Sequence, residues 1–140
     1  MDKQTALDFL RLHQPMPAQL SDQLAAEFRA VREFLRDNPC DEALEPLLRS
    51  LNEGDGVGEY PLVDEVLGAA DDAAAVAAIR AVLEDPSTGS GARFWATLFS
   101  VSFVRKELIA SLETSLKYAN DDLIELTKVW RHRLNTQTMI

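Results

Sequence analysis

Apolar residues recur with helical spacing along nearly the whole chain, and no stretch alternates between apolar and polar residues over the length of a strand. In one example, which follows Ser21, four apolar residues fall at positions i, i+4, i+7 and i+11: Leu24, Phe28, Val31 and Leu35. This spacing gathers apolar side chains on one face of an α-helix. The pattern therefore predicts an all-α protein.

The first 38 residues are expected to form a pair of helices. Asp2 is positioned to cap a short helix that ends before the rigid segment Pro15-Met16-Pro17, because proline restricts the backbone. Ser21 is a good N-cap for the second helix, and Asn38-Pro39 stops it. The sequence thus predicts an N-terminal helical pair over residues 1–38.

From residue 41 the helical stripes come in pairs, each pair joined by a polar loop: NEGDGVGEYPLV (52–63), DPSTGSG (85–91) and KYAND (117–121). The last apolar residue before each loop is Leu51, Leu83 or Leu116, so the steps are 32 and 33 residues. Such a period is typical of stacked helical hairpins, each of which packs on its neighbours. We expect three hairpins over residues 41–134, within one domain of 140 residues.

Several segments resemble HEAT-type helical repeats. ALEPLLRSL (43–51) and AAIRAVLEDPS (77–87) look like first helices, with Pro46 at the usual bend and Asp85-Pro86 at the usual turn. The resemblance implies a short right-handed α-solenoid of antiparallel helical hairpins. The third hairpin lacks the proline and the Asp-Pro turn, and is expected to be an irregular terminal cap.

The segment GARFWA (91–96) is similar to the start of a HEAT second helix, where an arginine and a small residue three positions later are common. Arg93 and Ala96 occupy these positions. The layout of the whole chain also resembles small bacterial HEAT-like proteins encoded beside toxin genes. Some of those are immunity proteins, and the resemblance implies a protein that neutralises a cognate toxin by binding it.

Charge is concentrated in the middle of the chain. The formal net charge is −9, with −1 in residues 1–40, −10 in residues 41–85 and +2 in residues 86–140. An acidic block repels phosphate backbones, which disfavours nucleic-acid binding, and attracts a basic protein such as a toxin domain. The alternative is a solvated face that only maintains solubility.

The sequence contains no sustained apolar run. About 18 apolar residues in succession would be needed to span a membrane, and the start MDKQTALDFL has the pattern of neither a signal nor a transit peptide. We therefore expect a cytoplasmic protein without a membrane partner.

The glycine-rich loop raises the question of a ligand site. Its acids Asp55 and Glu59, with Asp64 in the next helix, lack the order of a calcium loop and have no histidine nearby. Asp55-Gly56 and Gly58 accept positive φ, which favours a simple chain reversal. The loop GSGA (89–92) has neither of the phosphate-binding glycine patterns, so a linker is again favoured over an anion site.

No other group of residues predicts catalysis. His13 and His132 lie at opposite ends of the sequence without a ligand cluster, and no Gly-x-Ser-x-Gly elbow occurs. The acids Asp121, Asp122 and Glu125 fit a solvated helix start capped by Asn120. We therefore expect a protein that is not an enzyme, with no catalytic residues, metal or cofactor.

Aromatic residues crowd the segment that begins with GARFWA. If Phe94, Leu98 and Val101 face the core, Trp95 and Phe99 lie on the adjoining face, either as a second core layer or as a binding anchor. The core is the favoured interpretation.

The resulting hypothesis is a protein-binding module of immunity type, with an acidic and aromatic partner-binding surface. Its six candidate residues are Asp55, Glu59, Asp64, Glu65, Arg93 and Trp95. The alternative is an enzyme or accessory lyase on a HEAT scaffold, acting on a small ligand. A binding module predicts a broad open surface, whereas an enzyme predicts a pocket with converging polar groups.

Overall fold

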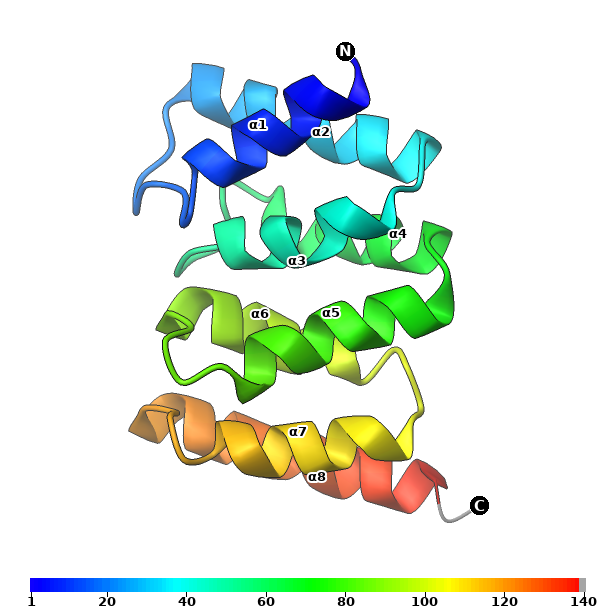
Figure 1. Cartoon of the computed structure of the whole chain (residues 1–140). Helices are drawn as coiled ribbons and strands as arrows, with labels where there is room; N and C mark the ends of the chain where they lie inside the picture. Colours follow the sequence, from blue (N-terminus) through cyan, green and yellow to red (C-terminus); the bar gives the residue numbers. More distant parts are fainter. Residues whose placement is uncertain (139–140) are drawn as a thin grey trace.

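The computed structural model describes residues 1–138, and within this range all regular structure is helical (Figure 1). The all-α prediction is confirmed. The helices are α1 (Lys3–Leu12), α2 (Asp22–Asp37), α3 (Asp41–Ser50), the 3₁₀-helix η1 (Tyr60–Leu62), α4 (Val63–Ala69), α5 (Asp72–Glu84), α6 (Ser90–Ser100), α7 (Lys106–Ser115) and α8 (Asp121–Thr138).

The odd-numbered helices lie side by side in sequence order, and α1, α3, α5 and α7 each pack against the next (Figure 1). Of the four predicted helical pairs, three pack together directly: α1 with α2, α5 with α6, and α7 with α8. The pair α3 and α4 differs, because α3 packs mainly on α1, α5 and α6, whereas α4 packs on α2 and α5. In the first of the three predicted hairpins, the two helices therefore pack mainly on other helices and not on each other.

Local capping signals set the helix boundaries as the sequence predicted. The side-chain oxygens of Asp2, Ser21 and Asn120 accept the backbone N–H three residues later, at 2.8, 3.1 and 2.9 Å. Each bond satisfies one of the N–H groups left without a partner in the first helical turn. Helix α2 ends at Asp37, directly before Asn38-Pro39.

A continuous apolar core runs between the helices and includes residues of every α-helix. The alanine-rich helix α5 lies at its centre and packs on α3, α4, α6 and α7, because small side chains such as Ala75 and Ala78 allow close approach. No helix within residues 1–138 has the length and apolarity required to cross a membrane.

The N-terminus of α6 packs directly on the chain that follows α3. Gly91 lies so close to the backbone of Asn52 and Glu53 that a Cβ atom there would overlap with it. Backbone atoms cannot move aside as a flexible side chain can. Gly91 thus sets how closely α6 approaches the glycine-rich loop.

Two helical glycines provide a test of this contact. We expect Gly91→Ala to lower the free energy of unfolding by about 2 kcal/mol, because the added methyl group overpacks a closed contact. Gly68, in α4, has open space around its Cα, so Gly68→Ala should raise it by about 0.5 kcal/mol through helix propensity. Urea denaturation of both variants measures the difference, and changes of the same sign would contradict the packing role of Gly91.

Candidate functional site

The glycine-rich loop between α3 and η1 is a compact chain reversal. Gly54, Gly56 and Gly58 have φ angles of 84°, 58° and 81°, and Val57 between them has φ 56°. The Asp55 side chain accepts the Val57 N–H at 3.1 Å, and the Asp55 carbonyl accepts the N–H of Tyr60 at the same distance. The predicted use of glycine for positive φ is confirmed at Gly56 and Gly58.

Tyr60 anchors this loop in the core. Its side chain is 1% exposed and makes edge-on contacts with Phe28 of α2 and Trp95 of α6, at centroid distances of 5.6 and 6.2 Å. A Cβ atom at Gly56 would overlap with the Tyr60 ring, so the loop passes directly over the phenol. Burial raises the pKa of Tyr60.

Polar contacts fasten the same loop to α6. The indole N–H of Trp95 donates to the carbonyl of Gly54 at 3.2 Å, and the Ser90 hydroxyl donates to the Glu53 carboxylate. The loop is thus held by both the first turn and the middle of α6. It is a fixed part of the fold.

The position of Glu59 contradicts the prediction that this residue lies on an exposed acidic surface. Its carboxylate is buried and accepts from Arg29 at 2.7 Å and from Arg32 at 3.2 and 3.3 Å. Glu65, which is more exposed, pairs with Arg32 at 3.3 Å and with Arg36 at 3.5 Å. Both acids therefore bind α4 and its preceding turn to α2, and Glu59 offers no surface to a partner.

Arg93 is likewise an interior residue, with 1% of its surface exposed. Its guanidinium donates to the carbonyls of Leu83 and Asp85 at 2.8 and 2.6 Å and to the Ser115 hydroxyl at 2.9 Å. It thereby joins the C-terminal end of α5 to α7. Burial lowers the pKa of Arg93. The expectation that it lies on a binding surface is wrong.

The aromatic residues of α6 divide between core and surface. Trp95 and Phe99 are 7% and 6% exposed and stack on one another, so the core interpretation is confirmed and Trp95 is not a surface anchor. Phe94 is 37% exposed. The residue expected to face the core is therefore the one that meets solvent, because the buried stripe of α6 is rotated by one position.

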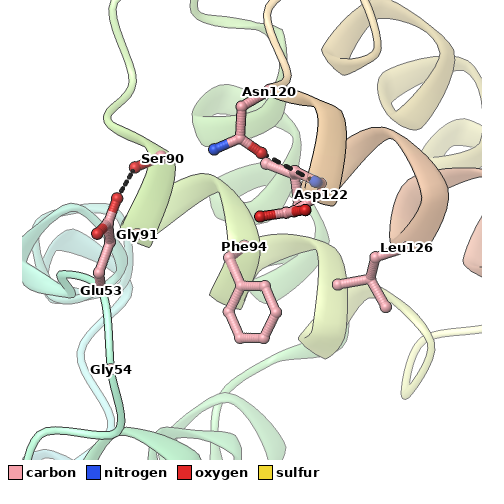
Figure 2. A pocket seen from close by; sticks show the side chains of 9 residues that line it. Glu53, Gly54, Ser90, Gly91, Phe94, Asn120, Asp122 and Leu126 are labelled. Carbon is pink, nitrogen blue, oxygen red and sulfur yellow. Dashed lines mark hydrogen bonds between the residues drawn. The ribbon is translucent and has the colours of Figure 1, made fainter.

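Phe94 lies in a hollow of about 400 Å³ where all three predicted hairpin loops meet (Figure 2). We call it the Phe94 hollow. Its lining comes from the glycine-rich loop, from the start of α6 and from the start of α8: Glu53, Gly54, Ser90, Gly91, Phe94, Asn120, Asp122, Leu123 and Leu126. Two of these residues are acids and none is basic.

A second hollow of about 360 Å³ shares Glu53 and Gly54 with the first, because these residues line both. We call it the Val57 hollow, after an apolar lining residue that is 61% exposed. Its lining is Ala18, Gln19, Leu20, Glu53, Gly54, Asp55, Gly56, Val57 and Tyr60, again without a basic residue. Asp55 is the only candidate acid from the sequence that lines either hollow.

The remaining candidate, Asp64, is exposed at the start of α4 and has no basic partner within residues 1–138. The sequence interpretation missed Phe94 and Asp122, which had been assigned to the core and to a solvated helix start. The three loops recur at nearly equal intervals along the sequence, and this regular spacing was the signal that their residues lie close together. Within the described chain, no group of three potential metal ligands is close enough to hold an ion.

Comparisons with known protein families, with curated proteins and with solved structures gave no match.

The buried ion pair gives a stability prediction. Glu59→Gln leaves Arg32, whose side chain is 5% exposed, without its closest carboxylate, and we expect the free energy of unfolding to fall by about 3 kcal/mol. The matched control Glu65→Gln removes a partner that is 43% exposed, and should cost less than about 1 kcal/mol. Urea denaturation compares the two, and equal losses would show that burial of Glu59 is not decisive.

Proposed function

We propose that this protein is a small HEAT-like helical-repeat protein, a short right-handed α-solenoid, that binds a basic protein partner. The side-by-side packing of α1, α3, α5 and α7 supports the repeat architecture. So does the buried Arg93, which joins α5 to α7 from the position where HEAT second helices commonly carry an arginine.

The observation that carries the binding proposal is the charge around the two hollows. Within the acidic block of residues 41–85, Glu59 and Glu65 are paired with α2, whereas Glu53 and Asp55 are exposed and have no ion-pair partner within residues 1–138. Asp122 of α8, outside this block, is also exposed and unpaired within the described residues, and it lines the Phe94 hollow with Glu53. Unpaired charge of one sign beside apolar hollows attracts a partner of opposite charge.

We further propose an immunity-type role in the bacterial cytoplasm, in which the protein neutralises a toxin by occluding a basic surface. The layout of the chain supports this role: an N-terminal helical pair, a proline segment and a GDG-x-G-x-Y loop before a short helix. The partner would lie across both hollows, with the exposed side chains of Phe94 and Val57 contributing apolar contact.

Co-expression with the products of neighbouring genes tests this role. A neighbour that arrests growth alone should be tolerated in the presence of the protein, and the purified pair should associate more slowly as salt concentration rises. If no neighbour is bound, the immunity role is excluded.

A charge-matched pair of triple variants tests the location. The hollow variant carries Glu53→Gln, Asp55→Asn and Asp122→Asn, which preserve the side-chain acceptors for Ser90 and Val57. We expect its association rate to fall about tenfold, because three steering charges are lost.

The control variant carries Asp41→Asn, Asp71→Asn and Asp72→Asn, at the N-terminal ends of α3 and α5. Its net charge is identical to that of the hollow variant. We expect less than a twofold change in association rate, measured by stopped flow. Equal effects of the two variants would show that only net charge matters, and would exclude the two hollows as the binding site.

A further inference from the structure

The Phe94 hollow has the composition of a site for a cation with an apolar stem. Phe94, Leu123 and Leu126 supply apolar surface, and the carboxylates of Glu53 and Asp122 supply negative charge without a basic residue in the lining. We propose that this hollow receives the side chain of an arginine from a basic protein partner.

The arrangement places two carboxylates around an aromatic ring. Figure 2 shows Glu53 to the left of Phe94, Asp122 above it and Leu126 to its right. Glu53 comes from the glycine-rich loop and Asp122 from the first turn of α8, so the two acids are brought together only by folding. An occupant between them would contact both the glycine-rich loop and the start of α8.

The walls of the hollow are held in place before any ligand arrives. Ser90 donates to Glu53, and Asn120 caps α8 by accepting the N–H of Leu123 at 2.9 Å. Phe94 packs edge-on against the buried Trp95, with ring centroids 5.2 Å apart and planes at 85°. A preformed site loses less conformational entropy on binding than a mobile one.

The two carboxylates retain capacity for a ligand. Within residues 1–138, Asp122 has neither a hydrogen bond nor an ion pair from its side chain, and Glu53 accepts from side chains only at Ser90. Both residues are exposed, so water now solvates them. A cation that enters the hollow replaces this water with charge-assisted hydrogen bonds.

Arginine fits this chemistry better than lysine. Its guanidinium is planar, donates two parallel hydrogen bonds to one carboxylate, and also stacks on aromatic rings. Its aliphatic stem can cover the apolar surface of Leu123 and Leu126. A volume of about 400 Å³ lies toward the small end of ligand pockets, which suits one side chain.

This inference rests on the proposed function only for the nature of the partner, so it is tested without one. The probes are three capped tripeptides, Ac-Ala-X-Ala-NH₂, in which X is arginine, lysine or citrulline, the neutral isostere of arginine. Each is titrated into the isotope-labelled full chain at low ionic strength and followed by amide NMR.

We expect the arginine peptide to bind with a dissociation constant of about 1 mM, equivalent to a binding free energy of about −4 kcal/mol. The amide chemical-shift changes should be centred on Gly54, Phe94 and Leu126. The lysine peptide should bind at least threefold more weakly and citrulline at least tenfold more weakly. Equal binding of arginine and citrulline, shifts elsewhere on the protein, or no binding would overturn the proposal.

Neighbouring acids in α8 provide the matched control. Asp122→Asn should weaken the arginine peptide at least fivefold, whereas Asp121→Asn, which changes an adjacent residue outside the lining, should change it less than twofold. Phe94→Leu keeps the hollow apolar but removes the ring, and should weaken binding about threefold. Unchanged amide spectra away from the hollow verify folding, and equal effects of the two α8 variants would contradict the site.

The peptide experiment tests the arginine site and the neighbouring-gene experiment tests the immunity role, so either proposal can be excluded without the other. If a neighbour is neutralised but the arginine peptide does not bind, the hollow is not the anchor and the immunity role stands. If the peptide binds with the expected selectivity but no neighbour does, the arginine site stands and the immunity role is lost.

Discussion

The packing of Tyr60 between Phe28 and Trp95 is the interaction on which the rest of the molecule depends. Helix α4 has only seven residues, and α3 and α4 pack on other helices more than on one another. The buried phenol, directly before α4, connects α2 to α6 through three aromatic rings. The absence of a side chain at Gly56 of the loop and at Gly91 of α6 lets the loop close over that contact, so Gly56 serves packing as well as chain reversal.

Most of the fold could be predicted because its signals are local. Helical periodicity and the caps at Ser21 and Asn120 depend on residues three or four positions apart, and these boundaries agree with the structure. The separation of α3 from α4 could not be predicted. It depends on how a loop packs against α6, about 40 residues later, and no local pattern encodes that distance.

The candidate site was harder to predict, because a charge count along the sequence ignores which charges meet in space. Glu59 belongs to the acidic block, yet its partners Arg29 and Arg32 lie in the preceding segment and remove it from the surface. On α6 the error is one of rotation. Successive residues on a helix point about 100° apart, so Phe94 and Trp95 exchange surface and core when the face is misjudged by one position.

The Phe94 hollow is lined in part by the first and third predicted hairpins, which are not direct neighbours in a simple repeat stack. In such a stack each hairpin stabilises only its neighbours, and the terminal hairpin frays first. Here an occupant that touches Glu53 and Asp122 bridges the loop after α3 to the start of α8, across the intervening α5–α6 pair. A bound partner would therefore hold the C-terminal hairpin, α7 and α8, to the loop after α3. This hairpin would then open together with the earlier helices and not before them.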